Sequence, residues 1–246
     1  VPLQLQRLDE ALEDYTELLN KYPESFLAAE GAFELGQVQA YMQDWESLQA
    51  NYDELLEEKQ GYRDRPRVRF ALGIMTYARG EFEAAAEFFR GIESDLGLYY
   101  LGRCLEEDGR YIMAIQHYRQ ALRRYPDSPL ADDVAFSIAE AFYDSKQFKV
   151  ATRSYTRFLE DYPQSEYIPM TNYKMACISF QTGEYNDTIN RLEDLCERFP
   201  EAEIVSYAHY LEGSCQMALG STSHAIFAYT EVVQRYPGSS LAAAAL

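Results

Sequence analysis

Five aromatic–proline pairs punctuate this chain, and they constrain its fold more than any other feature. The pairs are Tyr22-Pro23, Tyr125-Pro126, Tyr162-Pro163, Phe199-Pro200 and Tyr236-Pro237. The last four prolines stand 37 residues apart. Because proline lacks a backbone N–H and cannot continue a helix, each pair predicts a helix end. A period of this length indicates stacked repeats, which present extended surfaces rather than one enclosed catalytic cleft.

Each repeat reads as an antiparallel pair of helices. In the copy that ends at Pro126, apolar or small residues recur at spacings of three and four in two separate runs: Leu98, Leu101, Gly102 and Leu105, then Ala114, Tyr118 and Ala121. These spacings give one apolar face per helix. Gly109 stands between the two runs, where the first helix must end and the chain turn back.

With its Leu-Gly, Gly-x-Tyr, Ala, Tyr, Ala and Pro positions, the unit resembles the tetratricopeptide repeat. The resemblance covers nearly the whole chain and implies an all-α, right-handed solenoid superhelix of antiparallel helix pairs. We expect six complete pairs at about 29–60, 66–94, 95–126, 132–163, 169–200 and 206–237, after a lone second helix at about 3–21. Residues 1–94 form the N-terminal units on this interpretation. Residues 95–246 form a regular array, followed from Leu241 by the start of another helix.

One step of the repeat is irregular. Ala85 and Ala114 occupy equivalent places but stand 29 residues apart instead of 37. Two explanations are open: a minimal loop after Ile92, or a short helix near residues 93–98. The first residues read as the second half of a repeat, so the chain has the character of a piece of a longer one.

Three of the repeats end in Tyr-Pro-x-Ser, with serines Ser128, Ser165 and Ser239. We expect each serine to cap the following helix with its side-chain oxygen. Units of this form are similar to those of bacterial envelope proteins, including the Tol-Pal-associated coordinator and the outer-membrane assembly lipoproteins. The resemblance implies a periplasmic or outer-membrane-associated protein. Cytoplasmic bacterial scaffolds with similar units are the alternative.

The charge of the chain restricts its partners. Formal net charge is −18, from 22 basic and 40 acidic residues, so nucleic acid and anionic membrane surfaces would be repelled. The sequence contains no run of about 18 apolar residues that could span a bilayer. A protein partner is the remaining expectation.

A stripe of aromatic residues on the first helices is the main candidate for partner binding. If the closing proline is position 32 of each unit, position 5 is aromatic in all six units, as Phe33, Phe70, Tyr99, Phe136, Tyr173 and Tyr210. Position 12, seven residues later on the same helix face, adds Tyr77, Tyr143 and Phe180. By resemblance, first helices line the concave groove, so this stripe would receive an extended peptide or a partner helix. Packing against neighbouring helices is the competing explanation.

Arginines supply a second candidate. Arg63, Arg65, Arg67 and Arg69 crowd the start of a helix, where they either pair with Glu54, Glu57 and Glu58 or receive an acidic partner. The carboxylate clamp known in this family is absent, because position 5 is aromatic throughout. Only Arg67 and Arg103 fall on suitable groove positions.

Nothing in the sequence supports catalysis, a metal or a cofactor. Cys104, Cys177, Cys196 and Cys215 lack paired-ligand spacing and fall on helical segments, where they read as free, packed thiols, although a disulfide is open in an oxidising compartment. The three histidines show no metal-binding spacing.

The leading hypothesis is therefore a non-catalytic scaffold that binds a partner protein along its aromatic groove. Self-assembly is a second hypothesis, because residues 204–246 carry only Glu212, Glu231 and Arg235 as charged residues. Polysaccharide binding by an export scaffold is a third.

Overall fold

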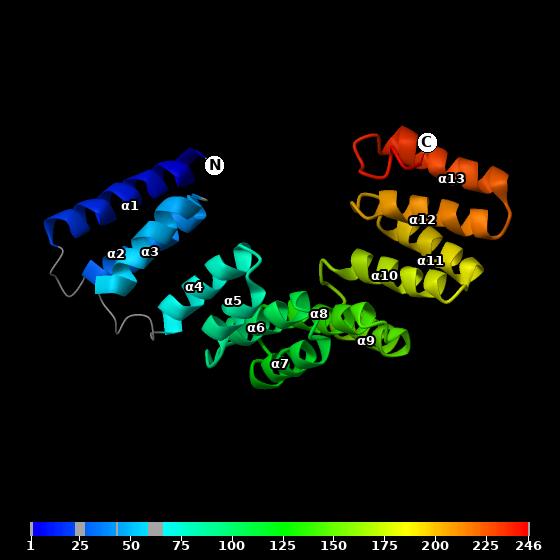
Figure 1. The fold of residues 1–246 in the computed structure, drawn as a ribbon. Coiled ribbons are helices and arrows are strands. Elements are labelled where there is room, and N and C mark those ends of the chain that lie inside the picture. Colours follow the sequence, from blue (N-terminus) through cyan, green and yellow to red (C-terminus); the bar gives the residue numbers. More distant parts are fainter. Residues whose placement is uncertain (1, 23–27, 43, 59–65, 246) are drawn as a thin grey trace. The chain divides into compact units, whose positions relative to one another are not determined.

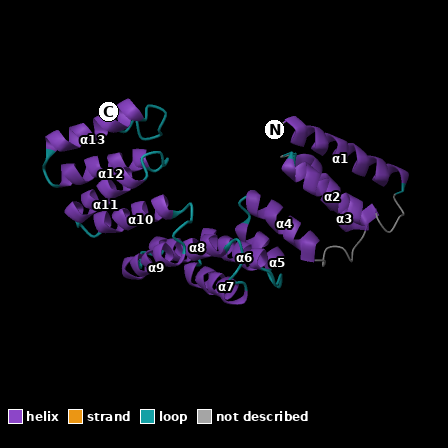
Figure 2. Cartoon of the chain, turned by 180° about the vertical axis from the view of Figure 1, so that it is seen from behind, coloured by secondary structure: helices purple, strands orange, loops and turns teal. Residues whose placement is uncertain are grey.

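The computed structural model describes residues 2–22, 28–42, 44–58 and 66–245, and these residues form helices joined by turns (Figure 1). The helices are α1 (Pro2–Lys21), α2 (Ala28–Tyr41), α3 (Trp45–Glu58), α4 (Pro66–Ala78), α5 (Phe82–Phe89), α6 (Asp95–Glu107), α7 (Tyr111–Arg124), α8 (Ala131–Asp144), α9 (Phe148–Asp161), α10 (Ile168–Gln181), α11 (Tyr185–Arg198), α12 (Val205–Ala218) and α13 (Thr222–Arg235). No strand occurs within the described ranges (Figure 2).

The helices pack in sequential antiparallel pairs, from α2 with α3 to α12 with α13. This confirms the predicted all-α architecture of six pairs, and α1 is the predicted lone second helix. The even-numbered helices are the first helices of their pairs, and the odd-numbered helices from α3 onward are the second helices.

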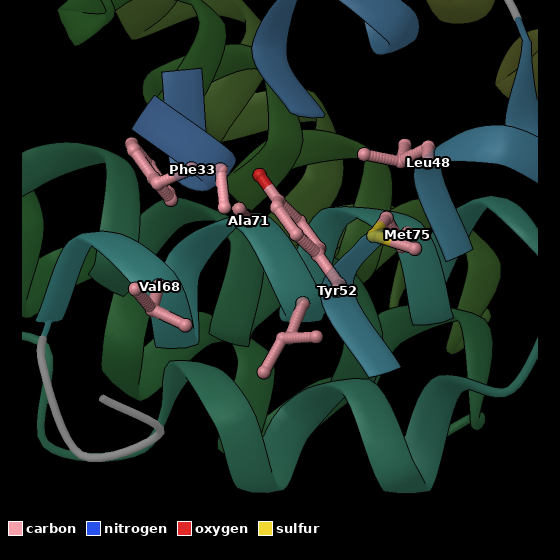
Figure 3. Close-up of a cluster of buried hydrophobic side chains, with 8 residues drawn as sticks. Phe33, Leu48, Tyr52, Val68, Ala71 and Met75 are labelled. Carbon is pink, nitrogen blue, oxygen red and sulfur yellow. The ribbon is translucent and has the colours of Figure 1, made fainter. Parts of the chain in front are cut away.

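The chain divides into two compact units, residues 1–92 and residues 93–246. In the first unit, a buried cluster joins α2, α3 and α4 through Phe33, Leu48, Tyr52, Val68, Ala71 and Met75 (Figure 3). Leu48 stands where most repeats have a small residue, and it is nevertheless 1% exposed.

Close approach within a pair depends on a small residue in the first helix. A Cβ added at Gly102 would lie 2.3 Å from the Tyr118 ring, far inside contact distance. An added Cβ would likewise clash with an aromatic ring of the second helix in three other pairs: at Gly36 with Tyr52, at Gly73 with Phe89 and at Gly213 with Tyr229. The small residue therefore makes room for a large buried side chain of the second helix, and this fixes how the two helices pack.

The turns inside the pairs require a left-handed residue. Gly80, Gly109, Gly183 and Gly220 occupy this place with φ between 72° and 81°, and Lys146 occupies it in the α8–α9 turn with φ of 59°. Glycine adopts this conformation without steric cost, whereas lysine does not.

The serines after the prolines do not cap helices as predicted. Helix α8 begins at Ala131, and its N-terminal cap is Leu130, without a side-chain hydrogen bond. Ser128 lies earlier, where its Oγ accepts from the Leu130 N–H at 3.1 Å and donates to Asp95 Oδ2 at 2.6 Å. Ser165 and Ser239 make the same turn, with the N–H groups of Tyr167 and Leu241. A serine two residues before the cap stabilises the turn instead.

The irregular step falls mainly in a helix, but not in the predicted place. Helix α5 has 8 residues, whereas the second helices of the later pairs have 14. Helix α6 begins at Asp95 with Ser94 as its cap, so residues 93–98 do not hold the short helix.

At Leu241, where the start of another helix was predicted, the structure has turns. The N–H groups of Ala244 and Ala245 both bond to the Leu241 carbonyl, and residues 241–244 form turns. One turn gains too few hydrogen bonds to offset the cost of helix nucleation.

Candidate functional site

Position 5 of each first helix packs against its own second helix. Its aromatic ring meets the side chain found 19 residues later, with ring centroids 6.1 Å apart for Phe33–Tyr52, 5.5 Å for Phe70–Phe89, 6.0 Å for Tyr99–Tyr118, 6.2 Å for Phe136–Tyr155 and 5.3 Å for Tyr210–Tyr229. Tyr173 packs against the cluster that contains Leu192 at the equivalent place. The packing explanation therefore applies to every unit.

These rings nevertheless keep an exposed edge in most repeats. Phe70, Tyr99, Phe136, Tyr173 and Tyr210 are partly exposed, whereas Phe33 is buried at 4% exposure. Half-buried rings combine a fixed position with accessible apolar area, which suits a binding surface. Phe33 has no such area to offer.

In three units, the aromatic ring at position 12 of the first helix also packs on the second helix of its own pair. Tyr77 packs on Phe82, Tyr143 on Phe148 and Phe180 on Tyr185, at centroid distances between 5.3 and 5.8 Å. In each case the partner is the first residue of the next helix. All three position-12 rings are partly exposed.

In residues 93–246, the first helices α6, α8, α10 and α12 carry a row of partly exposed aromatic rings, and we call this surface the first-helix face. It comprises Tyr99, Glu106, Phe136, Tyr143, Tyr173, Phe180, Tyr207, Tyr210 and Met217, all at positions 2, 5 or 12. Tyr207 and Met217 are its most open apolar side chains, 39% and 53% exposed. The predicted binding residues include neither, although Met217 stands at position 12 of the predicted stripe and Tyr207 at position 2.

The tyrosines of the second helices reach this face with their hydroxyls. Tyr118 donates to Glu106 Oε2 at 2.6 Å, and Tyr155 donates to Glu140. Burial, then the neighbouring Glu106 carboxylate, raises the pKa of Tyr118, and the same causes act on Tyr155 with Glu140. Both hydroxyls therefore remain protonated donors.

Glu106 on the face and Asp144, which directly follows Tyr143, are two carboxyl groups of raised pKa. Burial raises the pKa of Glu106 to about 7, while the hydrogen bond from Tyr118 and the charge of Arg103 oppose the rise. Burial is also the largest cause of the raised pKa of Asp144, and Glu140 adds to it. Like charges crowd this surface.

The two cations among these acids are already paired. Arg103 lies 3.2 Å from Glu107 and 3.9 Å from Glu106. Lys174 Nζ lies 2.5 Å from Glu140 and 4.8 Å from the centroid of the Tyr143 ring. The face is thus aromatic and acidic, and its cations are not arranged to hold a partner's carboxylate.

Arg67 and Arg69 of the predicted arginine cluster make contacts within the chain. Arg67 lies 3.0 Å from Glu34, with its guanidinium 5.0 Å from the centroid of the Phe33 ring. Arg69 donates to the carbonyls of Glu87 and Arg90, at the carboxyl end of α5. Pairing within the chain was one of the two predicted explanations, although the partner of Arg67 is Glu34 rather than Glu54. Arg63, Arg65 and the side chains of Glu57 and Glu58 lie outside the described residues.

Comparisons with known families agree with the repeat architecture. Two tetratricopeptide repeat models match, one over residues 33–97 and one over residues 3–25 and 207–239. The chain is a tetratricopeptide repeat protein. The model of the YfiO outer membrane lipoprotein family matches residues 93–179 of this repeat protein. Among curated proteins, none matches it.

Solved structures show the same fold in other repeat proteins. A tetratricopeptide repeat protein from Parabacteroides merdae is similar with a TM-score of 0.68, at 16% identity over 94% of this chain and 88% of that one. PilW, described as a type IV pilus biogenesis factor, has a TM-score of 0.67 at 17% identity, over 88% of this chain and 97% of its own. YrrB, described as having an unusual peptide-binding site, has a TM-score of 0.52 at 16% identity, over 79% of this chain and 96% of its own.

The cysteines of this tetratricopeptide repeat protein are free thiols in helices α6, α10, α11 and α12. Burial raises the pKa of Cys104 to about 12 and those of Cys196 and Cys215 to about 11, so they are poor nucleophiles. Within the described ranges, no cluster of three or more His, Cys, Asp or Glu residues could hold a metal ion. In the same ranges, no helix has the length and apolarity to cross a bilayer.

Proposed function

We propose that this protein is a non-catalytic scaffold that binds a peptide or helix of a partner protein along its first-helix face. The observation that carries the proposal is the open apolar surface of α12, where Tyr207 and Met217 continue the row of half-buried rings on α6, α8 and α10. Aromatic anchors of this kind dominate the binding energy of protein interfaces.

Charge narrows the class of partner. Glu106, Glu107, Glu140 and Asp144 outnumber Arg103 and Lys174, and both cations are engaged. A partner segment with apolar anchors and positive charge fits this surface, whereas an acidic segment would be repelled.

In full, the proposed binding residues are those predicted from the sequence: Phe33, Phe70, Tyr77, Tyr99, Phe136, Tyr143, Tyr173, Phe180, Tyr210, Arg67, Arg69 and Arg103. Five of these residues, Phe33, Arg67, Arg69, Phe70 and Tyr77, belong to the first unit, where the burial of Phe33 and the engagement of Arg69 give these two a role in packing rather than in direct contact. Tyr207 and Met217 join the set.

We further propose that the scaffold acts in a bacterial envelope assembly, in the periplasm or at the outer membrane. The match of residues 93–179 to an outer membrane lipoprotein family supports this setting, as does the likeness of fold to a pilus biogenesis factor.

Peptides selected from a displayed random library against the full chain would test the binding function. The selected peptide is titrated against the wild type, the double variant Tyr207→Ala/Met217→Glu and the control Ile226→Glu. Ile226 is a matched control because it is 60% exposed but lies on second helix α13. We expect the double variant to weaken binding about tenfold or more and the control to leave it unchanged. Equal affinity for all three proteins would contradict the proposal.

Self-assembly through α13 is a second candidate, favoured by the exposure of Ile226 and Phe227 at 60% and 67%. The same three proteins distinguish it in sedimentation velocity runs over a range of concentrations. Self-assembly predicts that the wild type forms dimers and that Ile226→Glu is a monomer. A monomeric wild type at every concentration removes this candidate.

A further inference from the structure

A cleft with a basic rim lies on the second helices of residues 93–246, away from the positions that define the first-helix face. Helices α7 and α9 both pack on α8, and the space between them has a volume of about 660 Å³. This lies within the range of ligand-binding pockets. We call it the basic cleft, because its lining includes Arg119, Arg123 and Arg157.

The floor of the basic cleft is apolar. Leu122 from α7, Ala135 and Ile138 from α8 and Phe158 from α9 line it. Ile138 and Leu122 are partly exposed, so apolar area is available inside the cleft. A ligand that buries this floor gains from removing it from water.

Of the three arginines of the rim, one pairs with a carboxylate and two do not. Arg157 lies 3.0 Å from Asp161 and is 80% exposed. Arg119 stacks on the Phe142 ring at 5.7 Å, and Arg123 donates to the Arg119 carbonyl at 3.3 Å. Among the described residues, neither Arg119 nor Arg123 forms an ion pair. The lining therefore carries three cations and one carboxylate, in a chain of net charge −18.

The basic character belongs to these side chains and not to the repeat. The positions of Arg119, Arg123 and Arg157 are occupied 37 residues later by Thr156, Glu160 and Asp194, and that of Asp161 by Arg198. One repeat further on, the same four positions therefore carry two acids, one arginine and one threonine in place of three arginines and one aspartate.

We propose that the basic cleft binds an acidic segment of a partner protein that also carries apolar side chains. Guanidinium groups bind carboxylates through two parallel hydrogen bonds, and Arg119 and Arg123 lie one helical turn apart, about 6 Å along α7. The floor accommodates the apolar side chains of the same segment. An anionic bilayer fits less well, because a flat surface would also meet the acidic remainder of the chain. This proposal is independent of the first-helix face.

Three fluorescent peptides would test the proposal by anisotropy against the full chain: one alternating Glu and Leu, one alternating Lys and Leu, and one alternating Glu and Gly. The decisive variant is Arg119→Thr/Arg123→Glu, which introduces the residues of the next repeat at the same positions, where the fold already accepts them. Arg153→Glu is the matched control, since Arg153 is an exposed arginine of α9 outside the cleft lining.

We expect the double variant to weaken binding of the Glu–Leu peptide about tenfold or more, and the control to change it less than about twofold. Binding of the Lys–Leu peptide, whose charge suits the first-helix face instead, should be the same for the wild type and the double variant. Thermal unfolding of the three proteins verifies that they are folded. Absence of saturable Glu–Leu binding, equal binding of the Glu–Gly peptide or an unaffected double variant would each overturn the proposal. It would also be overturned if phosphatidylglycerol vesicles bound through the same arginines more tightly than the Glu–Leu peptide.

Discussion

The first-helix face and the basic cleft share the pairs α6–α7 and α8–α9, yet they differ in two ways. One is acidic and the other basic, and their charged side chains differ in whether they already form ion pairs within the chain. On the first-helix face, rings pack on the second helices and both cations pair with carboxylates. In the basic cleft, Arg119 stacks on a ring and Arg123 donates to a carbonyl, and neither pairs with a carboxylate of the described residues. One array can therefore offer two surfaces of opposite preference, because a helix pair fixes the backbone and leaves the charge of each outer position free.

The largest effect is expected from the buried side chain that joins α7, which carries Arg119 and Arg123, to α6 of the first-helix face. Tyr118 of α7 is 0% exposed, and its hydroxyl ends at Glu106. Tyr118→Ala removes the ring that fills the space beside Gly102, so the free energy of unfolding should fall by about 4 kcal/mol. Urea denaturation measures this.

Phe227→Ala is the control for that loss, because Phe227 is 67% exposed and should change stability by less than about 0.5 kcal/mol. If the two variants were equally stable, the tyrosine would not be the link between the helices of the pair.

A smaller effect, confined to the first-helix face, is expected from Glu106. The folded protein raises the pKa of Glu106 from 4.5 to about 7, so it binds this proton more tightly than the unfolded chain. Stability from this group is present below pH 4.5 and is lost as the pH rises towards 7. Glu106→Gln keeps an acceptor for the Tyr118 hydroxyl. Its free energy of unfolding should therefore be higher than that of the wild type by up to about 3 kcal/mol at pH 8 and equal to it at pH 4.

Denaturation at a series of pH values gives the difference between wild type and Glu106→Gln. Glu107→Gln is the control, because Glu107 is 39% exposed and pairs with the same arginine. A difference that stays constant from pH 4 to pH 8 would show that Glu106 ionises normally.

The sequence predicted the helix pairs well because their signals are local. An aromatic–proline pair follows α1, α7, α9, α11 and α13, and the small residue at Gly102 is required by the ring of Tyr118. The serine prediction failed because Ser128 lies before the helix begins. Its hydroxyl accepts from the Leu130 N–H within the turn and donates to Asp95. The short helix was predicted in the wrong place. The spacing of Ala85 and Ala114 shows that residues are missing between them, but it does not show which helix or loop is shorter.

The candidate surfaces were harder to predict than the fold. The position-5 stripe was identified, but its packing on rings 19 residues away was one of two open explanations, since periodicity alone does not say what covers a face. The basic cleft escaped the sequence entirely. Its arginines come from α7 and α9, and only the packing of both helices on α8 brings them to one site.

The central claim is that a partner segment binds the first-helix face, and crosslinking tests it most directly. The library-selected peptide, synthesised with a benzophenone side chain, is irradiated with the full chain, and the crosslinked residues are identified by mass spectrometry. The account predicts crosslinks to α8, α10 and α12 near Tyr143, Tyr207 and Met217, and their loss with unlabelled peptide in excess. Crosslinks confined to α7, α9 or α13 would contradict it.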